Sequence, residues 1–138
     1  MNSDTCYNTG NGSYQKWYIG NDIRAILMAN DEVSKLVGTK IFPLVAAEGT
    51  EGEFIVYERA RYSKTATKMG VVQDECTIIL SAIADDYDTA IQIASAIDNA
   101  LTGKHTKDDG TPIMMNLADS TEAFSDGKFI ELLTYNIK

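Results

Sequence analysis

The side chains that most often carry out acid–base or metal chemistry are few in this sequence and lie far apart. The single histidine, His105, stands in a segment rich in lysine and aspartate, and no neighbouring residue is placed to orient it as a general base. One histidine also falls short of the ligand set of a zinc site. We therefore predict that His105 is an exposed loop residue without a catalytic role.

Two acidic clusters and one glycine pair are partly similar to ion- or phosphate-binding motifs. Asp85, Asp86 and Asp88 lack the acceptor that a calcium loop needs at its twelfth position, and they stand where a helix is expected to begin. The run 108–110, Asp-Asp-Gly, is typical of a turn. The run 10–12, Gly-Asn-Gly, lacks the Lys-Ser/Thr of a phosphate loop. The sequence therefore predicts no catalytic residue, no metal site and no cofactor.

The two cysteines, Cys6 and Cys76, are far apart in the sequence and form neither a CxxC pair nor a zinc spacing. Cys76 lies within an apolar strand pattern, so we expect a buried thiol. A disulfide framework is not expected, and a reducing compartment fits this cysteine usage.

One group of basic residues is suited to contact with a partner macromolecule. Arg59, Arg61, Lys64 and Lys68 follow one another along an expected strand and the loop after it. In an acidic protein, such a concentration favours contact with an acidic surface or with DNA. The plainer alternative is a solvated hairpin.

A second candidate contact lies at the N-terminus, which is rich in Asn, Ser, Thr, Gly and Tyr. Residues 1–18 are typical of a flexible arm. Tyr14, Trp17 and Tyr18 depart from this polar composition, because exposed aromatic rings are costly. We expect them to dock on the rest of the domain or on a neighbouring subunit.

Composition limits the classes of function. The chain has 138 residues, 12 basic and 20 acidic side chains, and a formal net charge of -8. This length suits one domain with a core of its own, and the acidic balance argues against a general nucleic-acid binder. We expect no signal peptide, no membrane span and synthesis as a soluble protein in the cytoplasm.

The periodicity of apolar residues predicts a small set of elements. Helices are expected at 21–29, capped by Asn21 or Asp22, at 31–37, capped by Asp31, and at 85–101. A short extended piece is expected at 41–44, and longer strands at 54–62, 71–83, 112–123 and 128–137. Polar loops are expected at 63–70 and 104–111, with a tight turn at 125–127.

The predicted elements define a fold class. Strict alternation would place Ile55, Tyr57, Arg59 and Arg61 on one face of their strand, opposite a second set: Phe54, Val56, Ala60 and Tyr62. The longest helix has a predicted packing stripe, namely Tyr87, Ala90, Ile91, Ala94, Ile97 and Leu101. We predict one α+β domain over 19–138, with two layers: a mostly antiparallel sheet and helices packed on one face.

Several of these segments, in this order, resemble one protein family. The run Leu36-Val37-Gly38 is followed by Ile41-Phe42-Pro43, and the strand 53–59 reads Glu-Phe-Ile-Val-Tyr-Glu-Arg. The strand 75–82 leads into the helix start at 85–90, and 129–137 closes the pattern. This combination resembles the small tail-completion proteins of long-tailed bacteriophages, which include tail terminators. Phe42 stands where the family commonly has tyrosine, and Glu53 where it has proline.

The resemblance covers about four-fifths of the chain, and its motifs are structural. It implies a phage or prophage morphogenesis protein that caps the tail tube and joins tail to head as a ring, usually a hexamer. Expected partners are further copies of the chain, the tail-tube protein and the head connector, with DNA only passing through the lumen. The implied location is the bacterial host cytoplasm during assembly, and then the neck or tail of the virion. A small ligand-binding or regulatory α+β domain is the alternative function.

Overall fold

The structure is a computed structural model that describes residues 16–66, 68–70, 72–107 and 110–138. These residues form a 3₁₀ turn, three α-helices and six strands. In chain order these are η1 (Lys16–Tyr18), α1 (Ile19–Ala29), α2 (Asp31–Val37), β1 (Ile41–Pro43), β2 (Phe54–Ala66), β3 (Val72–Ala84), α3 (Tyr87–Leu101), β4 (Gly103–Thr106), β5 (Pro112–Ser125) and β6 (Lys128–Ile137).

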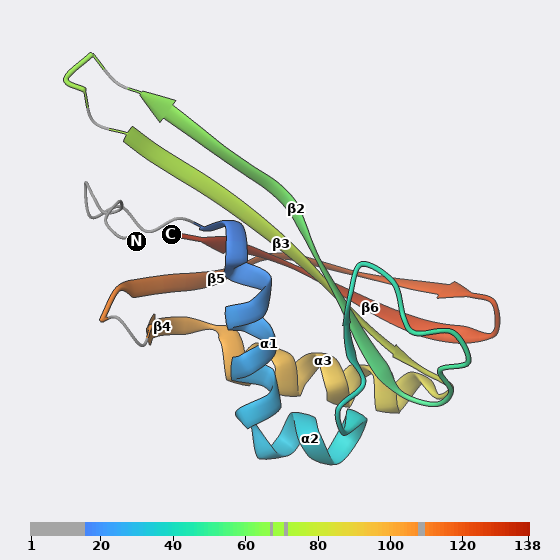
Figure 1. Cartoon of the computed structure of the whole chain (residues 1–138). Coiled ribbons are helices and arrows are strands. Elements are labelled where there is room, and N and C mark those ends of the chain that lie inside the picture. Colours follow the sequence, from blue (N-terminus) through green and yellow to red (C-terminus); the bar gives the residue numbers. More distant parts are fainter. Residues whose placement is uncertain (1–15, 67, 71, 108–109) are drawn as a thin grey trace.

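All six strands belong to one curled sheet, in the order β1-β2-β3-β6-β5-β4. Only β1 and β2 pair in parallel, and every other neighbouring pair is antiparallel. The three helices lie on one face of the sheet (Figure 1). The predicted fold class is therefore confirmed. The prediction of a loop over 104–111 was wrong in its first part, because β4 occupies 103–106.

Two long hairpins extend from the sheet in opposite directions (Figure 1). One is formed by β2 and β3, and the other by β5 and β6. The second hairpin turns at Asp126 and Gly127, whose φ angles are 52° and 76°. Positive φ at both turn positions matches the right-handed twist of the strands and confirms the predicted Asp-Gly turn.

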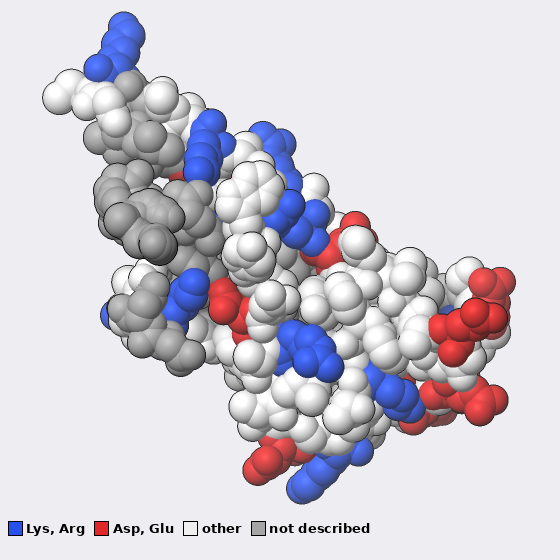
Figure 2. All heavy atoms as spheres, viewed as in Figure 1, with Lys and Arg blue, Asp and Glu red and all other residues white. Residues whose placement is uncertain are grey.

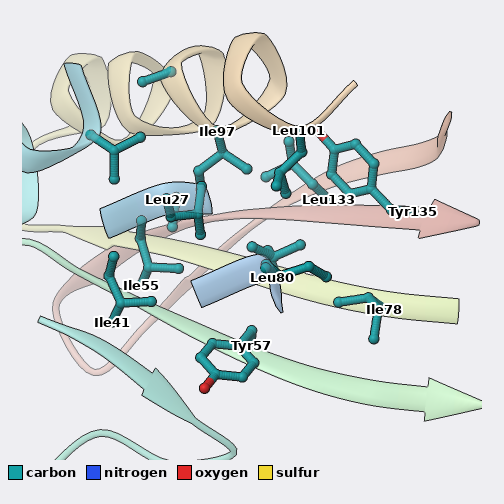
Figure 3. Packing of buried hydrophobic residues seen from close by; sticks show 14 of the residues in the cluster. Leu27, Ile41, Ile55, Tyr57, Ile78, Leu80, Ile97, Leu101, Leu133 and Tyr135 are labelled. Atoms are coloured by element: carbon teal, nitrogen blue, oxygen red, sulfur yellow. The ribbon is translucent and has the colours of Figure 1, made fainter. Parts of the chain in front are cut away.

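The core lies between α3 and the middle of the sheet (Figure 3). Ile97 and Leu101 of α3 face Leu80 of β3 and Leu133 of β6, and all four are almost fully buried. Beside them the ring of Tyr135 is completely buried, and its hydroxyl donates a hydrogen bond to Asp98 Oδ1 at 2.7 Å.

Two parts of the predicted helical stripe were wrong. Ile91 is 39% exposed and Tyr87 is 43% exposed, whereas Ile93 is fully buried. The helix starts at Tyr87, and its buried side follows positions 90, 93, 97 and 101. A spacing of three and four residues can begin at several positions in an Ile- and Ala-rich helix, so the phase is set by the sheet beneath it.

The helix starts show which polar residues act as caps. Asp86 accepts a hydrogen bond from the Thr89 backbone N–H at 3.0 Å, which confirms the acidic start of α3. For α2 the cap is Asn30, which accepts from the Val33 N–H at 3.1 Å, and Asp31 is instead the first helical residue. Among the described residues, no side chain caps α1, which begins at Ile19 directly after η1. The chain is already turning there, so neither Asn21 nor Asp22 is in a capping position.

Candidate interaction surfaces

An irregularity in β2 decides which of its side chains share a face. Arg59 lies opposite Ile78 of β3, but Arg61 lies opposite Thr77, because the register shifts between the two arginines. This β-bulge at Ala60 reverses the alternation. Arg59 and Tyr62 therefore lie on the helix-covered side of the sheet, and Arg61 on the open side. The predicted grouping of Arg59 with Arg61, and of Tyr62 with Phe54, was wrong for this reason.

A partly buried ion pair fastens the start of the described chain to the β2–β3 hairpin. The Lys16 Nζ lies 2.7 Å from Asp74 Oδ1, and Lys16 is only 4% exposed. The Lys16 backbone N–H donates to the Tyr62 hydroxyl oxygen at 3.2 Å, and that hydroxyl donates to Asp74 Oδ2 at 3.4 Å. Three residues that are far apart in the sequence thus hold η1 on the hairpin.

On this anchor lies a stack of aromatic and cationic groups. The Trp17 ring meets the Tyr62 ring edge-on, with 5.2 Å between centroids. The Arg59 guanidinium carbon is 4.8 Å from the Trp17 centroid and 5.9 Å from the Tyr62 centroid. Lys64 places its Nζ 5.7 Å from the Tyr62 centroid. Cations over aromatic faces attract the ring quadrupole, so these groups form one connected surface, the Trp17–Arg59 stack.

The structure brings together only some of the predicted contact residues. Trp17, Arg59 and Lys64 share the stack, and Trp17 remains 58% exposed. Tyr18 is 72% exposed beside the stack, and Lys68 is exposed at the tip of the β2–β3 hairpin. Tyr14 and residues 1–15 as a whole lie outside the described part of the chain. Sequence reasoning missed Lys16, Asp74 and Tyr62 as the anchor, since no local pattern relates them.

His105 is placed differently from its prediction. It is part of β4 and partly buried, and its Nε2 lies 2.7 Å from the Leu101 carbonyl oxygen. This bond ties the start of β4 to the end of α3. Among the described residues, no group of three His, Cys, Asp or Glu side chains could hold a metal ion.

The predicted buried thiol is confirmed at Cys76, which is 2% exposed on the helix-covered face of β3. Burial raises the pKa of this thiol. A raised pKa disfavours the thiolate, which is the nucleophilic form, so this position belongs to the core.

The sheet face away from the helices carries an apolar band. Phe54 of β2, Ile83 of β3 and Ile130 of β6 lie opposite one another across three strands. The half-buried apolar side chains of this open face are Phe42, Phe54, Val56, Ile79, Ile83, Ile130 and Leu132. No described helix packs on this side (Figure 1). Each of these side chains is therefore partly exposed to solvent.

The two outer strands cover their neighbours only in part. β1 pairs with 55–57 of β2, which leaves the outer edge of β2 from Glu58 to Ala66 without a strand partner among the described residues. β4 pairs with 112–115 of β5. The outer edge of β5 from 116 to 125 therefore also has no strand partner among the described residues. Sheet edges of this length present unpaired backbone groups.

The two open edges differ in charge. Lys and Arg side chains lie along the β2–β3 hairpin, and Asp and Glu side chains gather around the end where the β5–β6 hairpin turns (Figure 2). On β2 the basic residues are Arg59, Arg61 and Lys64. The β5 edge has Asp119 and Glu122 and no Lys or Arg. The molecule is therefore electrically polar from one hairpin to the other.

A carboxyl pair lies on the acidic hairpin. Glu122 of β5 and Glu131 of β6 are cross-strand partners, and Tyr87 donates a hydrogen bond to Glu122 Oε2 at 2.8 Å. Burial, and then contact with Glu122, raises the pKa of Glu131 from 4.5 to about 7. Two adjacent carboxylates cannot both ionise freely, so Glu131 keeps its proton to a higher pH than an ordinary glutamate and loses it as the pH passes through about 7.

No helix in the described part of the chain is both long and apolar enough to cross a membrane.

Two comparisons with known proteins agree with this architecture. The profile of a family described as "Tail completion protein gp17" matches residues 21–129. Among solved structures, a chain from the virion of a native gene transfer agent particle aligns with a TM-score of 0.68. That alignment covers 83% of this chain and 89% of that chain at 18% identity, and at such identity it shows a shared fold. No curated protein matches the chain.

The family match extends from α1 into the β5–β6 hairpin and includes most of the segments that carried the resemblance. It confirms that resemblance, and with it the expectation of a structural virion component and not an enzyme. Because the profile spans most of the residues, the chain belongs to the tail completion protein gp17 family.

Proposed function

We propose that the protein assembles into a ring that caps the tail tube and joins the tail to the head. The observation that carries this proposal is the apolar band on the open face of the sheet. Family membership makes the chain a tail component. The half-buried apolar side chains of the open face would be removed from water if the chain assembled with copies of itself.

The band is costly for an isolated subunit. Each large aliphatic or aromatic side chain gains roughly 1.5–3 kcal/mol when it is fully removed from water. Ile83, Ile130 and Leu132 are only half-buried, so part of that free energy remains available to an interface. Contiguous exposed apolar surface commonly marks a site of protein–protein contact.

A ring also suits the polarity of the molecule. The basic β2–β3 hairpin and the acidic β5–β6 hairpin are different surfaces, so contact between them is heterologous. Repeated heterologous contact closes into a ring when the rotation between subunits allows it. A hexamer is the proposed size, with the tail-tube protein on one side and the head connector on the other.

The net charge of -8 supports a passage for DNA. Phosphates are repelled by an acidic wall, so DNA crosses such a lumen without being retained. The ring would form in the bacterial host cytoplasm during assembly and remain in the neck or tail of the virion.

The experiment is genetic complementation in the phage or related particle that encodes the chain. Deletion of the gene should give heads without joined tails, or tails of abnormal length, when particles are counted by electron microscopy. Expression of the intact chain in trans should restore joined particles. Normal particles from the deletion would contradict the proposed function.

The open face is tested in the same assay. Leu132→Glu should fail to restore joined particles, because a carboxylate would be desolvated in the subunit interface. Ile91→Glu is the matched control, since Ile91 is an exposed aliphatic residue on the solvent side of α3. Circular dichroism of both purified variants would establish that each remains folded.

A further inference from the structure

We propose that neighbouring subunits are joined edge to edge, with the free half of β2 in one copy hydrogen-bonded to the free half of β5 in the next. This inference rests on the proposed ring and adds a contact at the sheet edges to the one that the open face makes. The partner of each edge is a second copy of this chain. The six-stranded sheet of each subunit would then continue into the sheet of its neighbour.

The first support is the position of the two free edges. Met115, which β4 covers, aligns through Ile137 and Cys76 with Tyr62 in the free half of β2. At the other end of the sheet, Ala123 in the free half of β5 aligns through Ile130 and Ile83 with Phe54. The uncovered edges are therefore diagonally opposite, as the two hairpins show in Figure 1. Each subunit can thus engage one neighbour on each side at once.

The second support is the backbone hydrogen bonding that the described strands leave unmet at these two edges. The free half of β2 runs from Glu58 to Ala66, and the free half of β5 runs from 116 to 125, so the two are similar in length. Unpaired edges are templates for pairing with another chain, and proteins usually cover or blunt them. Strand addition would satisfy both edges of every subunit in a closed ring.

The third support is charge, which selects the partner edge. Two β2 edges brought together would oppose Arg61 and Lys64 of one copy with those of the other, and two β5 edges would oppose Asp119 and Glu122 in the same way. Like charges at an interface suppress wrong pairings. Only the pairing of β2 with β5 brings opposite charges together (Figure 2), and it is also the heterologous pairing that builds a ring.

Cross-linking of assembled particles tests the contact directly. A carbodiimide joins a lysine amine to a carboxylate only where the two already touch. Lys64 and Glu122 of one chain lie about eight residues apart along β3, or roughly 26 Å, so a link between them must join two chains. We expect links from Lys64 or Lys68 to Asp119, Glu122 or Asp126, identified by mass spectrometry of purified tails.

Charge reversal tests whether the contact is needed. Arg61→Glu with Lys64→Glu reverses the β2 edge, and Asp119→Lys with Glu122→Lys reverses the β5 edge. Each pair alone should lower the number of joined particles by at least about tenfold, the effect of 1.4 kcal/mol on one equilibrium. The four substitutions together should restore most of the joined particles, because the attraction is rebuilt with its signs exchanged.

Matched controls separate this contact from net charge. Lys35→Glu with Lys104→Glu gives the same net charge as the reversed β2 edge, and Glu32→Lys with Glu48→Lys gives that of the reversed β5 edge. All four control residues are exposed and lie off the two free edges. Both control pairs should support normal assembly, and thermal melting of every variant should show a folded subunit.

The outcomes distinguish this inference from the proposed function. If gene deletion abolishes joined particles but both reversed edges assemble normally, the ring stands and the edge pairing is overturned. Assembled particles without cross-links between β2 and β5 would also overturn it. Normal particles from the deletion would remove the proposed function itself.

Discussion

The Arg59 guanidinium lies over the Trp17 ring and also donates a hydrogen bond from its Nη1 to the Trp17 carbonyl oxygen at 2.9 Å. These residues are 42 positions apart, and together they connect η1 to the edge strand β2. The contact leaves more than half of the Trp17 surface exposed beside the proposed β2 interface. The stack therefore fixes the position of the exposed Trp17 ring beside the β2 edge, and it also holds η1 on β2.

The energy of this stack should be measurable in a double-mutant cycle. We expect Trp17→Ala and Arg59→Ala to show a coupling free energy of about 0.5–1 kcal/mol, as for an exposed cation–π pair. Urea denaturation of the two single variants and the double variant supplies the value. Tyr18→Ala is the control, since Tyr18 is more exposed and should change stability by less than about 0.5 kcal/mol. Strict additivity of Trp17→Ala and Arg59→Ala would mean that the stack contributes no coupling.

The Lys16–Asp74 ion pair should be sensitive to the loss of one partner. Asp74→Asn removes the carboxylate that contacts the nearly buried Lys16 ammonium group, and we expect a loss of about 3 kcal/mol in the free energy of unfolding. Lys16→Met together with Asp74→Leu should recover much of this loss, because neither charge is then left in the core. Chemical denaturation measures all three proteins. A double variant that is less stable than Asp74→Asn would contradict this account.

The corrected phase of α3 predicts a contrast between two isoleucines. Ile97→Ala removes fully buried methyl groups and should cost about 2–5 kcal/mol through lost transfer free energy and the cavity left behind. Ile91→Ala should cost less than about 1 kcal/mol, since Ile91 is already partly in water. Equal losses in thermal or urea unfolding would mean that the helix packs through a different side.

The Glu122–Glu131 pair predicts a pH dependence of stability. The folded pKa of Glu131, about 7, is above its unfolded value of 4.5, so between these values the folded state binds more protons. The free energy of unfolding contributed by this group is therefore fully present below pH 4.5 and is lost as pH rises through 7. Screening by solvent limits the effect to about 1 kcal/mol.

The measurement compares urea unfolding of the wild type and Glu131→Gln between pH 4 and 8. The amide imitates the protonated carboxyl, so the variant should be the more stable protein above pH 7, and the difference should shrink toward acid pH. Glu58→Gln is the control, because Glu58 is exposed on β2 and has no carboxyl as its strand partner. A difference that does not change with pH would contradict the raised pKa.

The sequence determined the classes of element and, through their order, the family. Alternating apolar residues in β2 and β3, an acidic cap before α3 and Asp-Gly at the last hairpin are local signals. Each depends on backbone sterics or on a hydrogen bond between near neighbours, so it can be read without knowing the fold. The helix-on-sheet α+β class followed from these signals, as did the resemblance to tail-completion proteins.

Tertiary structure decided on which face of its helix or strand each side chain lies, and which residues it contacts. The bulge at Ala60 places Arg61 on the face opposite Arg59. An alanine has no property that would predict a bulge at this position. The sheet selects Ile93 over Ile91, although either suits a helical stripe. The free edges arise because β1 and β4 are short relative to β2 and β5. Strand length and register depend on contacts between distant segments, and those contacts exist only once the whole sheet has formed.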